Sequence, residues 1–218
     1  VFNMLSGYSE PKNWNRLVLA PLWLRDTFMR LIRRETEHAR NHEPARIVAK
    51  MNSLCDKEII AALYEASAAG VEIDLIIRGI CCLKTGIPGV SETIHVRSIV
   101  GNFLEHARIF YFRNGGNEEF YMGSADWMPR NLDKRVEIMF PVEDPVLREK
   151  VRHILQVQLD DNVKAHILQP SGVYEKIDKR GKVLVNAQET FCEEAIVAAK
   201  TQAETVSSRV FIPLESEE

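Results

Sequence analysis

Apolar residues near the start of the chain recur at the spacing of an α-helix. Leu24, Phe28, Leu31 and Ile32 fall on one face of residues 20–40, and mainly polar residues occupy the positions between them. Pro21 stands at the beginning of this segment, where a helix tolerates proline. The pattern predicts a long amphipathic helix.

The next three segments alternate between strand and helix patterns. Residues 45–52 and 71–79 are short apolar runs rich in β-branched side chains, which indicates strands. Between them, residues 56–70 have helical spacing, with Asp56 as a capping residue and Gly70 at the end. This order predicts a βαβ unit, in which a right-handed helical crossover joins two parallel strands.

Polar side chains stand where the two predicted strands end. Lys50 and Asn52 close the first strand, and Arg78 closes the second. Open α/β sheets usually bind their ligands outside the carboxyl ends of parallel strands. We therefore expect a ligand at this edge of the sheet.

The later part of the chain predicts further strands and two more helices around one main domain. An Asn-Gly-Gly turn joins two of the strands into a hairpin. The closing "ESEE" indicates a frayed acidic tail. Strands are expected at residues 94–100, 107–114, 118–124 and 138–142, and helices at residues 144–162 and 188–202. The predicted fold class is α/β, a mixed sheet flanked by helices.

Composition and charge limit the classes of protein to consider. The 218 residues are 45% hydrophobic and 27% charged, which is ordinary for a globular domain. No run of about 20 apolar residues and no signal-peptide pattern is present, which argues against membrane insertion and secretion. The four cysteines have neither metal-ligand nor disulfide spacing, so we expect reduced thiols and a cytoplasmic protein. The absence of an initiator methionine suggests a fragment of a longer protein.

The stretch "FLEHARIFYF" places two polar groups among large apolar side chains. If it forms a strand, His106 and Arg108 share a face with Phe110 and Phe112. The end of the hairpin partner supplies Gly-Ser at positions 123 and 124. A histidine, a guanidinium, a hydroxyl and a glycine-permitted backbone approach suit phosphoryl chemistry.

A purely structural role for the same groups stays open. In that alternative, His106 bonds a backbone carbonyl and Arg108 pairs with Glu105 or Glu137. The net charge of −3 provides no bulk attraction for a polyanion, so any phosphate binding depends on local clusters of basic residues.

The histidine and the Gly-Ser strand end together resemble the phospholipase D superfamily, with several departures. Arg108 stands where that superfamily usually has lysine, and Asp126 stands where it usually has asparagine. The acidic residue expected a few positions after the histidine is replaced by Phe112 and Arg113. These departures argue against a standard phosphodiesterase.

Four segments together resemble the long-chain polyphosphate kinase family over nearly the whole chain. They are "KMNSLCDKEIIAALYEASAAGVEIDLIIRGICCL", "RSIVGNFLEHARIFYF", "GSADWMPRNLDKRVE" and "KRGKVLVNAQ". The resemblance implies two phospholipase D-like halves, of which this chain is the C-terminal one. It also implies that residues 1–18 are the end of the preceding half and a linker, residues 19–168 are the catalytic half, and residues 169–218 are a C-terminal tail.

The resemblance further implies an activity and a set of site residues. Members of the family pass the ATP terminal phosphate reversibly to polyphosphate through a phosphohistidine, which here would lie outside the chain. Arg78 is similar to the family arginine that contacts ATP phosphates, and His106 to a second essential histidine beside the nucleotide. By superfamily motif position and charge, the same pocket has four weaker candidates: Arg108, Ser124, Asp126 and Arg130.

The remaining expectations concern cofactors and partners. Mg²⁺ is implied by the family, but the carboxylates here have no metal-ligand spacing, and we expect no metal ligand in the chain. The implied partners are ATP or ADP, polyphosphate, the N-terminal part of the same protein and further copies of it, but neither nucleic acid nor a membrane-spanning segment. Peripheral membrane association stays open. The alternatives are a dimeric phospholipase D-type phosphodiesterase and a non-catalytic domain that binds nucleotide or polyanion.

Overall fold

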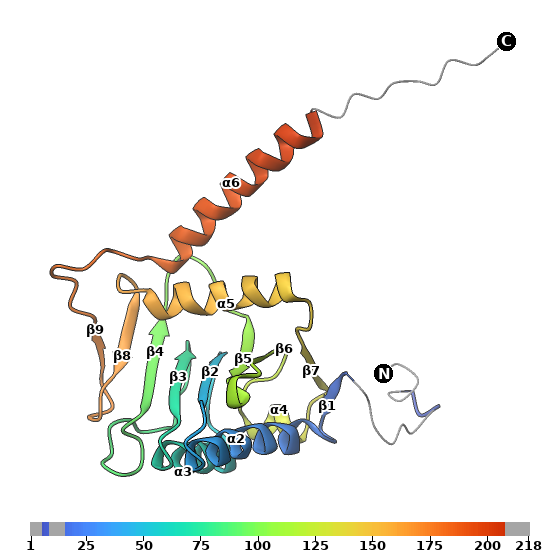
Figure 1. Ribbon diagram of the computed structural model, residues 1–218, viewed down its shortest axis with the longest axis vertical. Coiled ribbons are helices and arrows are strands. Elements are labelled where there is room, and N and C mark those ends of the chain that lie inside the picture. Colours follow the sequence, from blue (N-terminus) through green and yellow to red (C-terminus); the bar gives the residue numbers. More distant parts are fainter. Residues whose placement is uncertain (1–5, 9–15, 208–218) are drawn as a thin grey trace.

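The fold is built on one nine-stranded mixed sheet with helices on both faces (Figure 1). The computed structural model describes residues 6–8 and 16–207, so the predicted acidic tail and most of residues 1–15 lie outside the described residues. The strands follow the order β1-β7-β6-β5-β2-β3-β4-β8-β9. They are β1 (Val18–Ala20), β2 (Arg46–Met51), β3 (Glu72–Ile77), β4 (Ile94–Ile99), β5 (Arg108–Phe112), β6 (Glu119–Gly123), β7 (Glu137–Pro141), β8 (Ala165–Leu168) and β9 (Tyr174–Lys176).

Two apolar cores lie on opposite faces of the sheet. Ile47 and Ala49 of β2 point toward one core together with residues of two helices, while Val48 points toward the other core, against a third helix. Successive strand residues point to opposite faces, so a continuous apolar strand such as β2 can serve both cores. The first two helices are α2 (Leu24–Arg40) and α3 (Lys57–Ala68), and the third is α5 (Pro145–Asp160). The predicted class, a mixed α/β sheet flanked by helices, is confirmed.

The βαβ prediction holds in detail. Strands β2, β3 and β4 are parallel neighbours, and α3 connects the first two. The Asp56 carboxylate caps α3 by accepting a hydrogen bond from the Ile59 amide at 3.0 Å. Gly70, with φ of 96°, lets the chain turn after the helix. The polar residues at the ends of β2 and β3 therefore lie at one edge of the sheet, as expected.

The predicted hairpin is also present, but its first strand is shorter than expected. Strands β5 and β6 pair antiparallel, joined through the turn η1 (Asn114–Gly116), whose three residues all have positive φ. The pairing of β5 with β2 ends at Ile109, and the pairing with β6 ends at Arg108. Residues before Arg108 have no strand beside them, so His106 lies in a connection and not on a strand.

Several short elements escaped the sequence prediction. Strands β1, β8 and β9 have three or four residues each, too few to show a clear period. The helix α4 (Pro129–Asp133) has five residues, and α2 begins at Leu24, after β1 and a turn at residues 21–23. The final helix α6 (Ala187–Ser207) projects away from the body of the domain (Figure 1). None of the described helices is both long and apolar enough to cross a membrane.

Candidate functional site

The candidate site lies at the sheet edge where β2 and β3 end and where β5 begins. Asn52 follows β2 and Arg78 follows β3. Arg108, the first residue of β5, is paired with Gly123, the last residue of β6. Because β5 runs antiparallel to β2, the start of one meets the end of the other. The topology therefore gathers four separate segments at one edge.

Asn52 connects the two arginines of this edge. Its side-chain oxygen accepts a hydrogen bond from Arg78 Nε at 3.0 Å and a second one from Arg78 Nη2. Its backbone amide donates to Asp126 Oδ1 at 2.8 Å. Asp126 in turn binds Arg108. A continuous chain of hydrogen bonds therefore runs from Arg78 through Asn52 and Asp126 to Arg108.

Arg108 and Asp126 form a buried ion pair. Arg108 Nε donates to Asp126 Oδ1 at 3.0 Å and its Nη2 donates to Oδ2 at 3.3 Å. The two side chains are only 10% and 4% exposed. The remaining Arg108 nitrogen, Nη1, donates to the His106 carbonyl at 2.5 Å. The ion pair thereby fixes the backbone of His106, whose side chain is exposed to solvent.

Two of the sequence candidates are separate from this chain of contacts. The Ser124 hydroxyl is exposed and bonds the Glu137 carboxylate, which also accepts from Asn131 Nδ2 at 2.5 Å. Arg130 is exposed in α4, and its guanidinium makes no hydrogen bond within the part of the chain that the structure describes. The contacts therefore bring together Arg78, Arg108, Asp126 and the backbone of His106, but not Ser124 or Arg130.

A third cation stands close to the two arginines. Lys50 is 3% exposed on β2. Burial lowers the pKa of its ammonium group, the hydrogen bond to Glu105 opposes this, and the charges of Arg78 and Arg108 lower the pKa further. Lys50 and Arg108 each pair with a carboxylate, whereas Arg78 pairs with an amide. The charge of Arg78 is therefore the one that remains for an anionic ligand.

The carboxylates of this edge do not suit a divalent cation. Asp126 uses both of its oxygens for Arg108 and for the Asn52 amide, and Glu105 uses both of its oxygens for amides and an ammonium group. Magnesium takes oxygen ligands in near-ideal octahedral geometry and usually keeps several waters, with one or two carboxylates and substrate phosphates as its other ligands. Within residues 6–8 and 16–207, no group of three or more His, Cys, Asp or Glu side chains gathers at one place. Within the described residues, the carboxylates of this edge are therefore engaged by donors of the protein itself.

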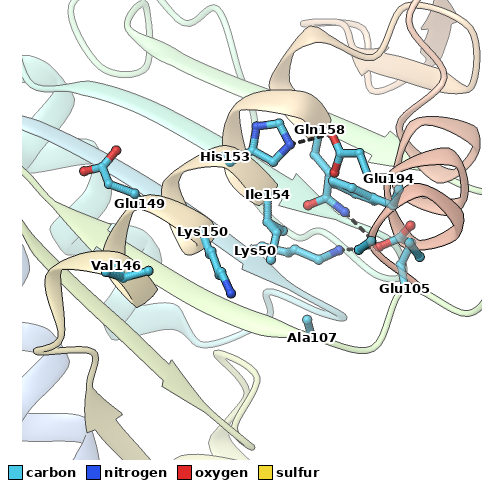
Figure 2. Close-up of a pocket in the computed structure, with 13 residues that line it drawn as sticks. Lys50, Glu105, Ala107, Val146, Glu149, Lys150, His153, Ile154, Gln158 and Glu194 are labelled. Atoms are coloured by element: carbon cyan, nitrogen blue, oxygen red, sulfur yellow. Dashed lines mark hydrogen bonds and ion pairs between the residues drawn. The ribbon is translucent and has the colours of Figure 1, made fainter. Parts of the chain in front are cut away.

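A cavity of about 940 Å³ opens next to the site, between α5 and α6 (Figure 2). The surface that faces the cavity is mostly apolar, but charged residues such as Lys50, Glu105 and Lys150 are among those that line it. The ammonium group of Lys50 points toward the Glu105 carboxylate (Figure 2). His153 Nε2 and Glu194 Oε1 bridge the two helices at 2.7 Å. Neither Arg78 nor Arg108 lines this cavity. The sheet edge that carries these two residues, called the arginine edge below, therefore remains the candidate site for an anion.

Sequence reasoning found the ends of β2 and β3 but missed part of the polar network. Lys50 could be recognised from the sequence as a charged side chain inside the apolar run of β2. Glu105 could be recognised only because it directly precedes His106. Gln188 bonds Glu105 from the start of α6, more than 80 residues along the chain. No local pattern connects it to the site.

Comparison with known proteins identifies relatives over most of the chain. The family described as "Polyphosphate kinase C-terminal domain 2" matches residues 17–188. The polyphosphate kinase of Thermosynechococcus vestitus is 56% identical over 174 residues, which make up 80% of this chain and 24% of that protein. The polyphosphate kinase of Synechocystis sp. is 50% identical over 205 residues, 94% of this chain and 28% of that protein. The chain thus spans about a quarter of the length of these relatives.

Solved structures agree with the sequence matches. The crystal structure of polyphosphate kinase from Porphyromonas gingivalis superposes with a TM-score of 0.87 at 42% identity, over 92% of this chain and 31% of that one. Nuc from Salmonella typhimurium, a phospholipase D family member, superposes with a TM-score of 0.52 at 16% identity, over 71% of this chain and 97% of that one. The second likeness is one of fold alone.

Proposed function

Since the chain belongs to the polyphosphate kinase family, we propose that it is the C-terminal catalytic part of an enzyme that transfers the terminal phosphate of ATP reversibly to inorganic polyphosphate. Phosphoryl transfer develops negative charge on the equatorial oxygens and requires positioning and cations. The observation that carries the proposal is Arg78, a cation held by Asn52 at the ligand-binding edge of the sheet with no carboxylate partner in the described residues.

In this proposal, the residues at this edge of the sheet have different roles. Arg78 binds the phosphates of ATP with the donors that Asn52 leaves free. His106, exposed at the same edge, binds phosphate or transfers a proton to the reacting group. The covalent phosphohistidine belongs to a part of the enzyme outside this chain. Arg108 and Asp126 hold the backbone of His106 in place, and Ser124 and Arg130 remain weaker candidates for contact with the phosphate chain.

The same proposal covers the parts that the enzyme needs besides this chain. Mg²⁺ would accompany ATP, held by phosphates, waters or residues elsewhere in the protein, and would supply positive charge for the transferred phosphate. Residues 1–18 would be the end of the preceding catalytic half and a linker, residues 19–168 the catalytic half and residues 169–218 a tail. The full protein would be a cytoplasmic homo-oligomer, with peripheral membrane association as a further option.

The test of the site uses the full-length enzyme with Arg78→Ala and His106→Ala. Each substitution is expected to lower ATP-dependent polyphosphate synthesis by about 10² to 10³, the usual effect of removing one group that stabilises a transition state. The measurement is the initial rate of polyphosphate formation at saturating ATP and Mg²⁺.

Matched control variants come from the opposite edge of the same sheet. Arg113 follows the far end of β5, and His95 lies near the start of β4, and both are exposed. Arg113→Ala and His95→Ala are expected to leave the rate unchanged. Normal rates in both Arg78→Ala and His106→Ala would refute the site assignment.

A further inference from the structure

The connection between β4 and β5 carries His106 but does not bury its own large apolar side chains. Phe103 is 60% exposed and Leu104 is 69% exposed. A loop that buries so little apolar surface gains little stability from packing, and its conformation must be held in another way. Polar contacts from three other elements supply that restraint.

The first contact comes from Gln188 in the first turn of α6. Its side-chain amide bonds both backbone groups of Phe103: the Phe103 amide donates to Gln188 Oε1 at 3.0 Å, and Gln188 Nε2 donates to the Phe103 carbonyl at 2.9 Å. Gln188 is 6% exposed. Gly101 lies so close that a Cβ there would overlap with the Gln188 side chain. The loop and the glutamine are therefore fitted to each other.

The second contact involves Glu105, the residue directly before His106. Glu105 Oε1 accepts from Gln188 Nε2 at 2.8 Å, and Oε2 accepts from Lys50 Nζ at 2.7 Å and from Gln158 Nε2 at 2.9 Å. These donors come from α6, β2 and α5. On the other side, Arg108 binds the His106 carbonyl. Buried or half-buried polar groups thus hold the Glu105 side chain on one side of His106 and the His106 carbonyl on the other.

We propose that Gln188, acting with Glu105, is a positioning residue that holds His106 for phosphoryl transfer. The inference rests on the proposed function, because it takes His106 as part of the site. A buried lysine and glutamate pair is costly to desolvate and is often no better for stability than apolar residues of the same volume. The Lys50–Glu105 pair adjoins His106 in the chain, and Figure 2 shows Lys50 pointing at Glu105. The need to hold the loop that carries His106 accounts for an ion pair at this place.

The proposal is tested by a double-mutant cycle in the full-length enzyme. Gln188→Ala is expected to lower kcat for polyphosphate synthesis by about 10- to 100-fold, because misplacing a reacting group by about 1 Å can cost about 10² in rate. The KM for ATP should change much less than kcat, since Arg78 is untouched. In the His106→Ala background, Gln188→Ala should cause no additional loss, because a residue that acts through His106 has nothing left to position.

Two further variants separate positioning from packing and folding. Gln188→Met keeps the length of the side chain but removes its hydrogen bonds, and it is expected to behave like Gln188→Ala. Gln156→Ala removes a glutamine on the exposed face of α5 and is expected to match the wild type. The thermal unfolding midpoint of each variant should stay near that of the wild type.

The outcomes that overturn the proposal are distinct from those that overturn the proposed function. Wild-type kcat in both Gln188 variants, with His106→Ala inactive, would remove the positioning role and leave the function standing. Independent, multiplicative losses in the double variant would remove it as well. A fully active His106→Ala would instead refute the site assignment itself, and this inference with it.

Discussion

Arg108 and Asp126 are two positions whose residues differ from those expected from the sequence resemblance to the phospholipase D superfamily. Arginine replaces the usual lysine and aspartate replaces the usual asparagine, and the structure shows these two residues as partners in one buried ion pair. A guanidinium offers several donors and can bind a carboxylate with two of them, which a lysine cannot do in the same geometry. The two departures are therefore complementary. Arg108, held by Asp126, also donates to the His106 carbonyl.

This pairing predicts the effect of removing Asp126. Asp126→Ala would leave the buried Arg108 charge unpaired and the Asn52 amide without its acceptor. We expect the free energy of unfolding to fall by about 3 to 5 kcal/mol, the usual cost of breaking a buried ion pair from one side. Urea unfolding of the chain checks this. Asp126→Asn keeps an acceptor oxygen and should cost clearly less, and equal losses in the two variants would contradict the assigned role.

The helix α2 is fastened at its C-terminal end by a histidine. His38 Nδ1 bonds the Glu43 carboxylate, and its Nε2 lies 3.3 Å from Asn114 Oδ1 in the hairpin turn. The Glu43 carboxylate, as the largest influence, raises the pKa of His38, and burial opposes it. Positive charge is also favourable at the end of a helix, where carbonyl groups remain unpaired. The imidazole of His38 thereby connects the C-terminal end of α2 to the β5–β6 turn.

The raised pKa predicts a stability change with pH. A histidine whose pKa is higher in the folded than in the unfolded state, where it is about 6.5, contributes fully below that pH. The contribution is lost as the pH rises through the folded pKa. The free energy of unfolding should therefore decline above about pH 6.5, and Glu43→Gln should make that decline shallower. Urea unfolding at a series of pH values between 5 and 9 measures it, and identical slopes in the two proteins would count against the link.

Under the proposed function, the domain supplies one part of a larger reaction site. The arginine edge offers cations and an exposed histidine, but the covalent nucleophile of the proposed reaction is assigned to another part of the protein. The chain also covers only 24% and 28% of two of its relatives. In the proposed function, the domain supplies binding and positioning groups, and another part of the protein completes the site.

A prediction for the isolated 218-residue chain follows. Incubated with ATP, Mg²⁺ and a polyphosphate primer, it should form no polyphosphate above background, while the full-length enzyme under the same conditions should be active. Polyphosphate synthesis by the chain alone would contradict the two-part mechanism. Hydrolysis of a chromogenic phosphodiester by the chain, lost on His106→Ala, would favour the phosphodiesterase alternative instead.

Local patterns were sufficient for the larger elements and for one end of the site. The helical spacing of Leu24 and Phe28, the Asp56 cap and the Asn-Gly-Gly turn each depend on neighbours in sequence, so α2, α3 and the β5–β6 hairpin could be predicted. The polar residues after β2 and β3 followed from the rule for parallel strands. Strands of three or four residues carried too little pattern, and β1, β8 and β9 were missed.

The contacts of the site, in contrast, depended on pairing between distant segments. The register of β5 against β2 and β6 ends the strand at Arg108 and leaves His106 in a connection, and this register is set by contacts across the sheet. The bond from Gln188 to Phe103 spans 85 residues of sequence. Such contacts leave no periodic signal, because they join residues that share only a location in space. The sequence by itself thus determined which of the longer elements form and which edge of the sheet is polar. Only the tertiary structure decided which polar groups meet at that edge.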